Sequence, residues 1–590
     1  MADGLEANLA RVLYVDLSRR RFWVEDRRDL VDEYLGGVGL AIALAKEEGV
    51  DRADPLGPDN TIIFAVGPFN AAYPLASKTV AVFRSPLTGT LGESYAGGRS
   101  SVAIKLAGYA AIVIRGMSET PVYLAVHEEQ VKFRDASALW GTSSSETVGR
   151  VIREREPNPG LRTIMRIGLA GEKLVKYACV ITETYRHFGR LGLGAVFGSK
   201  KLKAVVVSGR KSLKVPDRRG YREVYDELYD LATKSNLMQK YHDLGTPMNV
   251  LPLSEIGALP TRNLKSGKFE RAEDISGEAM AANYLARRTA CSGCPVACIH
   301  LAAIREPYPH EKYFYKTTVV SYDYEPIYAL GSMLGVGDPV WLLRMIHEVE
   351  RLGLDAMSTG VALAWATEAL ERGLVREEDT VVKLKWGDAE AYKRAIALIV
   401  EQPNDFYRAL AQGVEKASEI YGGKEFAMAF GGNEMPGYHT GPAAHIGFLI
   451  GGRHSHLDNA GYSYDQKVKE LPEPEKVVDD LMKEEAWRMV LNSLVICLFA
   501  RGIYKPEMAS KALIPLGINL SPDDLRELGW KIYRERMALK VNMGFDPAKL
   551  RVPERILETP SPRGQITRDY MRRALGHFKE RLSEMGLLFK

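Results

Sequence analysis

The hydrophobic period of the chain changes near residue 210, and this change limits the possible folds more than any other feature. Before it, short apolar runs are separated by Gly, Pro and Asn, as in RVLYVDLSRRRFWVED, NTIIFAVGPF, KTVAVFRS and AAIVIRG. Such runs are typical of a hairpin and of further β-strands. After it, segments such as GYREVYDELYDLATKSN and DPVWLLRMIHEVERLGL repeat apolar residues every three or four positions, as amphipathic helices do. Sheet first and helices later predicts an α+β fold.

Two domain boundaries are expected, because 590 residues exceed the length of one ordinary domain. The segment LKAVVVSGRKSLKVPDRRGY has the pattern of a last strand followed by a charged, Pro-containing exit, which places one boundary near residue 210. A Gly-rich run, AFGGNEMPGYHTGPAAHIGFLIGGRHSH, interrupts the helices and suggests another near 420. We therefore expect a β-rich domain (1–210), a mainly helical domain (211–420) and a mainly helical C-terminal domain (421–590).

Charge and hydropathy exclude several classes of protein. The formal net charge is +4, and basic residues are spread along the chain, so we expect no nucleic-acid partner. No apolar run is long enough to cross a bilayer, and the N-terminus lacks the pattern of a secretory signal, which favours a cytoplasmic location. In a reducing compartment, the five cysteines are more often metal ligands or reactive groups than disulfide partners.

Three of the five cysteines fall within eight residues, in CSGCPVAC. Cys291, Cys294 and Cys298 would share one face of a continuous helix, but Pro295 disfavours a helix there, so we expect a loop that wraps three thiolates around one centre. Thiolates hold both iron–sulfur clusters and structural zinc, and the spacing does not choose between them. The distant cysteines are Cys179 and Cys497, each of which could equally be a small buried hydrophobic residue.

Seven motifs in register resemble the aldehyde:ferredoxin oxidoreductase family of tungsten-pterin enzymes. They are SPLTGTLGESYAGG with KLAGYAAIVIRG, YRHFGRLGLGAVFGSKKLKAVVV, CSGCPVAC, YEPIYALGS, ERLGLDAMSTG and NSLVICLF. The resemblance implies an N-terminal domain of two β-sheets that forms a base for a tungsten (or molybdenum) bis-pterin, covered by two mainly helical domains. It also implies a 4Fe-4S cluster held by Cys291, Cys294, Cys298 and Cys497, with Cys179 excluded as a ligand.

The resemblance also implies the residues that bind the pterins and a bridging magnesium. Its Gly-rich segments provide close backbone approach and free N–H donors for a cofactor with phosphates. The implied cofactor-binding residues are Lys78, Tyr95, Gly97, Gly98, Arg186, His187, Gly189, Glu350, Asp355 and Asn492.

Several of these positions differ from the family pattern. The family usually has Arg at Lys78, Asn at Tyr95 and Ala at His187. A backbone carbonyl could still serve from His187, whereas Tyr95 cannot replace an amide ligand. In the repeated motif ERLGLD and NSLVIC, Asn492 replaces a carboxylate and Val495 replaces a Gly. These departures indicate a divergent branch that retains the cofactor.

The resemblance implies that Glu325 and His456 lie beside the metal, with His454 as the competitor of His456. We expect aldehyde oxidation to carboxylic acids, with electrons passing through the cluster to ferredoxin or to a separate iron–sulfur subunit, in a family-like homodimer. One alternative is a related tungsten-pterin reductase that acts on another substrate, such as an aromatic thioester. A remote alternative is a non-catalytic scaffold with structural zinc.

Overall fold

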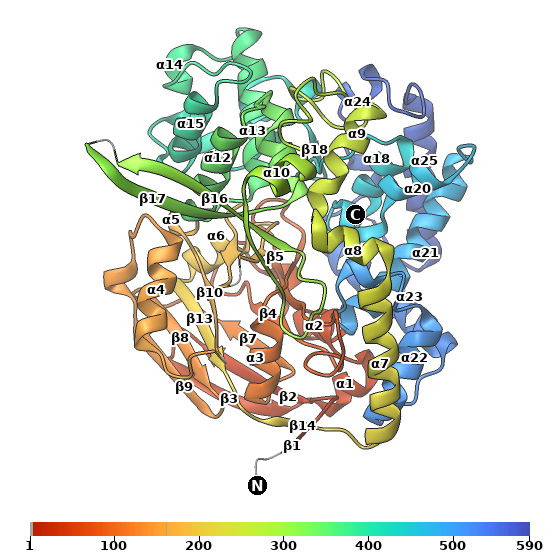
Figure 1. Cartoon of the computed structure of the whole chain (residues 1–590). Helices are drawn as coiled ribbons and strands as arrows, with labels where there is room; N and C mark the ends of the chain where they lie inside the picture. The colour runs from red at the N-terminus through yellow and green to blue at the C-terminus, as the bar shows by residue number, and fades with distance from the viewer. Residues whose placement is uncertain (1–3, 161, 184, 309, 590) are drawn as a thin grey trace.

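The computed structural model describes residues 4–160, 162–183, 185–308 and 310–589. Its N-terminal part contains two six-stranded sheets, which confirms the expected double-sheet base and the α+β class (Figure 1). The first sheet has the order β3 (Arg21–Asp26), β2 (Arg11–Asp16), β7 (Ala111–Arg115), β4 (Ile62–Ala65), β5 (Thr79–Arg84) and β6 (Leu91–Ala96). The second has the order β12 (His187–Phe188), β11 (Val180–Ile181), β10 (Arg162–Arg166), β13 (Leu202–Ser208), β8 (Val122–His127) and β9 (Gln130–Asp135).

The strands form where the sequence alternates branched apolar residues with turn residues. RVLYVDLSRRRFWVED folds into the predicted antiparallel hairpin β2–β3, in which Val12 pairs with Glu25. One apolar core joins the two sheets, with Phe64 of the first sheet 5.3 Å from the ring of Phe188 of the second. The outer face of the first sheet is covered by helix α2 (Gly37–Glu47). Helix α4 (Ser145–Arg155) packs on the second sheet.

The rest of the chain is mostly helical, as the periodicity predicts. The four clearest amphipathic segments form α7 (Arg218–Lys234), α12 (Pro339–Leu352), α13 (Ala356–Glu371) and α15 (Ala389–Glu401). The C-terminal part is built on α18 (Pro442–Ile450), α21 (Pro474–Ser493), α23 (Pro522–Asn542) and α25 (Arg568–Glu584). No helix in the described ranges is both long and apolar enough to span a membrane. The expected boundaries near 210 and 420 stay predictions.

A third sheet lies in the middle of the chain, which the sequence analysis expected to be helical. It consists of β15 (Leu285–Thr289), β16 (Ile299–Tyr308) and β17 (Glu311–Tyr322), paired in that order. Strands β16 and β17 form a long antiparallel ribbon that projects from the body of the molecule (Figure 1). At its base His300 pairs with Tyr322, so the ribbon connects the cysteine segment directly to the segment of Glu325.

Candidate cofactor and active site

The three clustered cysteines lie in a loop between β15 and β16, as Pro295 predicts. This loop packs closely on the turn after β6. Ser292 N donates to Gly98 O at 2.8 Å, and a Cβ added at Gly97 would lie 2.9 Å from Cys291 Sγ. A side chain at Gly97 would therefore have to displace the Cys291 thiol from its present position.

The fold brings Cys497 to the clustered thiols. It follows α21, and its N–H donates to Leu75 O at 2.8 Å. Burial raises the pKa of the Cys298 thiol to about 12; Arg186 opposes this shift, whereas Cys497 and Cys291 add to it. Burial also raises the pKa of Cys294, with further increases from Cys291 and Cys497. Such mutual effects place the four thiols in one neighbourhood, where bound iron would supply the positive charge that thiolates need.

Cys179 lies apart from this group. Burial raises its pKa, and the other raising charges come from Asp355 and Glu350 rather than from cysteines. Its Sγ lies 3.5 Å from Leu354 O. The geometry therefore associates Cys179 with the cavity described below, where it forms part of the wall.

Within the described ranges, no three His, Cys, Asp or Glu side chains are grouped as ligands of a single metal ion. In a four-iron cluster each thiolate binds a different iron, so its sulfurs stand farther apart than the ligands of one ion. Four partly buried cysteines could hold either a 4Fe-4S cluster or one zinc ion, and metal analysis distinguishes the two.

The two copies of the repeated motif have the same backbone shape. Gly353 in the first copy has φ +82° and Val495 in the second has φ +58°. A buried, β-branched residue in this left-handed region is unusual and costs about 1–3 kcal/mol. The backbone shape is therefore kept even where the Gly typical of the motif is absent.

Both copies also form equivalent backbone hydrogen bonds with the N-terminal part of the chain. In each copy, the fourth residue accepts a bond through its carbonyl, and the sixth donates one through its N–H. The pairs are Cys179 N to Gly353 O (2.9 Å), Lys78 N to Val495 O (3.2 Å), Asp355 N to Tyr177 O (3.0 Å) and Cys497 N to Leu75 O (2.8 Å). The predicted pseudo-symmetry of the motif is thus visible in the backbone.

A cavity of about 140 Å³ lies next to the first motif copy. Its wall includes His187, Gly189 and Glu325 together with Glu350 and Asp355. Within it, His187 Nε2 lies 3.7 Å from Glu350 Oε1. The structure thus brings five of the predicted site residues to the wall of one cavity. Asn492 lies at the end of α21, beside the start of α2, and does not line this cavity.

Arg190 is the clearest sign that this cavity is built for a polar ligand. Its Nε donates to Asp355 Oδ2 at 3.1 Å and its Nη2 to Glu434 O at 2.8 Å. The remaining Nη1 is buried and has no hydrogen-bond partner among the described residues. A buried guanidinium N–H group without a partner is costly unless a ligand accepts a hydrogen bond from it. Together with the carboxylates of Glu350 and Asp355, it fits a heterocycle that carries both N–H donors and anionic groups.

Lys78 and Arg186 lie near the cysteine loop, on its sheet-domain side. Lys78 Nζ would be 3.4 Å from a Cβ added at Gly97, and Arg186 Nη1 donates to Asp323 Oδ2 at 2.6 Å. Arg186 is therefore placed between the thiols and the cavity, since Asp323 lines the cavity wall, whereas Lys78 lies beside Gly97 and the cysteine loop. Cations at this position could bind phosphate groups.

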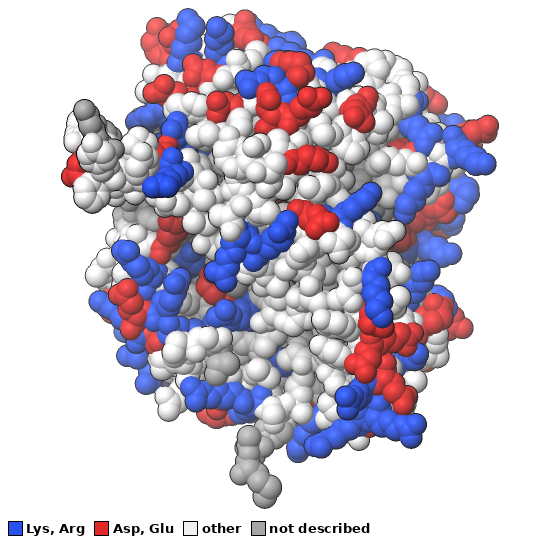
Figure 2. Space-filling view, in the orientation of Figure 1, with Lys and Arg blue, Asp and Glu red and all other residues white. Residues whose placement is uncertain are grey.

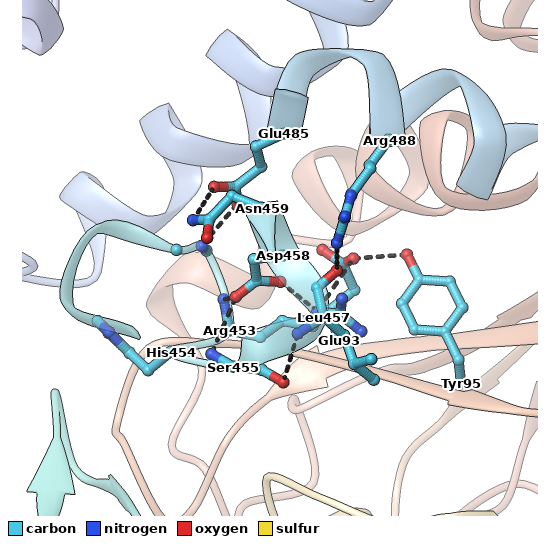
Figure 3. Close-up of polar contacts among 12 residues, drawn as sticks. Glu93, Tyr95, Arg453, His454, Ser455, Leu457, Asp458, Asn459, Glu485 and Arg488 are labelled. Carbon is cyan, nitrogen blue, oxygen red and sulfur yellow. Dashed lines mark hydrogen bonds and ion pairs between the residues drawn. The ribbon is translucent and has the colours of Figure 1, made fainter. Parts of the chain in front are cut away.

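Tyr95 has a different role from that of an amide ligand. Its hydroxyl donates to Glu93 Oε1 at 2.5 Å, and the guanidinium of Arg453 lies 4.9 Å from its ring centre (Figure 3). Burial raises the pKa of Tyr95, so the hydroxyl stays protonated. The side chain is thus engaged in a buried network, and only its backbone could face a magnesium ion.

Glu325 and His456 are in contact at the cavity wall. His456 Nε2 lies 3.1 Å from Glu325 Oε1, and Tyr438 Oη donates to the same oxygen at 3.3 Å. His456 is buried, and its Nδ1 has no partner among the described residues. With Glu325 ionised, Nε2 carries the proton and Nδ1 is free to accept one. The pair therefore offers a carboxylate that lines the cavity and, in contact with it, a buried imidazole with one unpaired nitrogen.

His454, the competing histidine, is occupied elsewhere. Its Nδ1 lies 2.9 Å from Phe448 O, and Lys540 Nζ donates to its Nε2 at 2.7 Å. Burial, followed by the charge of Lys540, lowers its pKa to about 3. The imidazole of His454 is neutral and both of its nitrogens are engaged, so this residue stabilises the loop.

A buried ion-pair network holds the loop from Gly451 to His456. Arg453 Nε donates to Asp458 Oδ1 at 2.6 Å and lies 4.0 Å from Glu93 (Figure 3). Arg536 pairs with Glu485 and with Glu93 in the same interior. The network connects β6, this loop, α21 and α23, so it fixes the loop that presents His456 relative to the sheets.

Sequence reasoning missed Arg190, Tyr438 and this network. Arg190 stands inside FGRLGLG, a segment singled out for its glycines, so a signal was present. Tyr438 lies in the Gly-rich run and Glu93 in a β-strand, where neither has a pattern of its own. Tyr438 contacts Glu325, 113 residues away, and Glu93 pairs with the still more distant Arg536, beyond the reach of any local pattern.

The chain is similar to known proteins over most of its length. The sequence profiles of "Aldehyde ferredoxin oxidoreductase, N-terminal domain" and "domains 2 & 3" match residues 12–209 and 223–585. Tungsten-containing aldehyde ferredoxin oxidoreductases of Thermococcus kodakarensis and Pyrococcus furiosus are 34% and 33% identical, each over 94% of this chain and 93% of theirs.

Two further similar proteins carry names other than aldehyde ferredoxin oxidoreductase. An aliphatic sulfonate oxidoreductase, WOR-like subunit, of Pyrococcus furiosus is 32% identical over 70% of this chain and 68% of its own. The solved active site complex BamBC of benzoyl coenzyme A reductase, with a TM-score of 0.81 and 20% identity over 99% of this chain and 97% of its own, shares the fold. On these matches, the chain is an oxidoreductase that belongs to the aldehyde ferredoxin oxidoreductase family.

Proposed function

We propose that this chain is a tungsten bis-pterin enzyme that oxidises aldehydes to carboxylates. The observation that carries the proposal is the contact of His456 with Glu325 at the wall of a cavity that also contains Glu350, Asp355 and the unsatisfied Arg190. The relatives of highest coverage cited above are named tungsten-containing aldehyde ferredoxin oxidoreductases, which supports both the metal and the substrate class.

The residues around the cavity would hold the cofactor. Glu350 and Asp355 supply acceptors for ring N–H groups, and Arg190 supplies a donor. Lys78 and Arg186 would bind its phosphates, with Gly97, Gly98 and Gly189 allowing close backbone approach. His187 and Tyr95 could offer backbone carbonyls to a magnesium ion, and Asn492 would serve the second pterin. When bound, the group supplies the two-electron redox chemistry.

Glu325 and His456 would move protons during turnover. Conversion of an aldehyde and water to a carboxylate releases two electrons and three protons. Glu325 is placed to take a proton from water, and His456 Nδ1, which is free, is placed to bind the substrate oxygen or its proton. Tyr438 would hold Glu325 in place through its hydroxyl. All three act in a largely buried site, where few waters compete for these bonds.

Cys291, Cys294, Cys298 and Cys497 would hold a 4Fe-4S cluster as the exit for electrons. Each turnover yields two electrons, so a one-electron carrier such as ferredoxin would be reduced twice. A cytoplasmic homodimer, or a complex with a separate iron–sulfur subunit, fits this proposal. The four half-buried cysteines support an exit at the surface.

The test is purification without oxygen, followed by analysis for tungsten, molybdenum, iron and zinc. Aldehyde-dependent reduction of a viologen dye is then measured over a panel that also contains an aliphatic sulfonate and an aromatic thioester. We expect about four irons per chain and the highest kcat/KM with an aldehyde. Zinc without iron, or activity confined to the thioester, would refute the proposal.

The role of Glu325 is tested by Glu325→Gln. Turnover should fall at least about 10²-fold, the usual contribution of a general acid–base group, with metal content unchanged. Glu371→Gln, which alters an exposed ion pair with Lys265, is the control and should keep full activity. Full activity of Glu325→Gln would contradict the assignment.

A further inference from the structure

The segments that carry the four cysteines reach the molecular surface. All four cysteines are only partly buried, and Gly293 between them is exposed. Three elements surround them: helix α8 (Asn236–Asp243), strand β15, which ends two residues before Cys291, and the segment after Cys497. Electrons that leave the cluster would cross this part of the surface.

These three elements form one continuous face. Arg288 Nε of β15 donates to His242 O at the end of α8, at 2.8 Å. His242 Nδ1 lies 2.8 Å from Val296 O in the cysteine loop. The rings of Tyr241 and Phe499 stack with their centres 4.2 Å apart, which joins α8 to the segment after Cys497. The three elements are therefore joined by direct contacts.

Five basic side chains lie on these three elements, at least partly exposed, and we call this part of the surface the basic face. They are Lys240, Arg287, Arg288, Arg501 and Lys505. None of them forms an ion pair with any residue in the described ranges, although many basic residues elsewhere do, such as Arg394 with Glu401. Asp243 and Glu507 are exposed acidic residues beside them, and Glu507 is paired with Arg526. Figure 2 shows blue side chains beside α8 and at the base of the β16–β17 ribbon, bordering a mostly uncharged area.

Unpaired charges of one sign around an electron exit create a local positive potential. Such a potential raises the association rate of an oppositely charged partner by about 10- to 1,000-fold at low ionic strength. Near-neutral net charge over the whole chain does not cancel it, because exposed charges beyond about 10 Å are screened at 0.1 M salt.

We propose that the basic face is the docking surface for an acidic iron–sulfur carrier protein of the ferredoxin type. The inference rests on the proposed function, because it assigns the partner of the proposed cluster. Lys240, Arg287 and Lys505 steer the carrier, whereas Arg288 and Arg501 also hold backbone carbonyls next to the cysteines through His242 O and Leu498 O. The part of the carrier that holds its own iron–sulfur cluster binds to the mostly uncharged area between these side chains.

The test is the charge-reversed holoenzyme Lys240→Glu/Arg287→Glu/Lys505→Glu. Arg288 and Arg501 stay unchanged, so the bonds beside the cysteines remain. The control is Lys132→Glu/Arg150→Glu/Arg155→Glu on β9 and α4, which makes the same change in net charge on exposed residues of the sheet domain. Binding of a recombinant acidic 4Fe-4S ferredoxin is measured by calorimetry, and kcat/KM is measured with this ferredoxin and with a viologen dye.

At low ionic strength the test variant should lose at least about tenfold in ferredoxin affinity and in kcat/KM for ferredoxin. Its viologen-linked activity should match wild type, and the difference in ferredoxin binding should shrink in 0.5 M salt. Unchanged ferredoxin binding, an equal loss in the control, or a proportional loss with the dye would overturn the docking assignment. Wild-type enzyme that binds ferredoxin but oxidises no aldehyde with either acceptor would refute the proposed function instead.

Discussion

Replacement of Arg453 by Met should loosen the loop that presents His456 without removing the loop's apolar contacts. Arg453 is buried, and its Nε faces Asp458 at 2.6 Å and Glu93 at 4.0 Å. At an effective dielectric constant of about 20, these attractions are about 6 and about 4 kcal/mol before desolvation is subtracted. Removal of one partner of a buried ion pair typically costs about 3–5 kcal/mol, because the remaining charge is left unpaired.

Hydrogen exchange of the loop amides measures this cost. Gly452 N donates to Glu485 at 2.8 Å, whereas Arg453 N and Ser455 N donate to Asp458 at 3.0 and 3.1 Å. If the loop opens locally, a loss of 3–5 kcal/mol lowers the protection of these amides by about 100- to 4,000-fold. We also expect kcat for aldehyde oxidation to fall, since His456 follows directly in the loop.

The control is Arg394→Met, which removes an exposed pair with Glu401 and should cost less than about 1 kcal/mol. Arg453→Lys should recover part of the protection, because it keeps the charge but not the guanidinium geometry. Unchanged protection in Arg453→Met, or equal losses in both Arg→Met variants, would show that the network does not fix the loop.

Three further outcomes follow from the structure. Burial raises the pKa of Asp465 to about 6, so the folded state holds a proton that the unfolded state loses near pH 4. The free energy of unfolding should therefore fall by about 2 kcal/mol from pH 4 to pH 6, and Asp465→Asn should remove this dependence in denaturant titrations. Gly97→Ala should lower iron content by displacing Cys291, whereas Gly502→Ala, with open space around its added Cβ, should not. Cys179→Ser should keep full iron content by metal analysis, and loss of iron would contradict its exclusion.

The sequence predicted the regular elements well where packing requires a clear period. The β2–β3 hairpin and helices α7, α12, α13 and α15 have one buried face each, so apolar residues recur at the matching interval. The β16–β17 ribbon was missed because much of it is exposed on both faces. Its outer half carries exposed aromatic residues such as Tyr313 and Phe314 instead of a one-sided apolar pattern.

The candidate site was predictable only in part, for a similar reason. Motif resemblance identified Glu325, His456 and the carboxylates of the first motif copy, which the fold gathers around one cavity. The resemblance favoured His456 over His454, which stands two residues away, but the residues themselves gave no physical reason for the choice. The decision comes from Lys540, which engages His454 and lies 86 residues away.

In the β16–β17 ribbon, the distance between the cysteine loop and the segment of Glu325 does not depend on how far the ribbon extends. In a single loop of the same length, both would change together. Its base is fixed by the pairing of His300 with Tyr322, so Cys298 and Glu325 keep their separation however many residues the ribbon contains. Residues can therefore be gained or lost at the far end, beyond the pair Tyr308 and Glu311, in steps that preserve the alternation of the strands. Evolution could lengthen this arm to reach new neighbours, and an experimenter could attach a label there, with the electron path and the proton-transfer groups left in place.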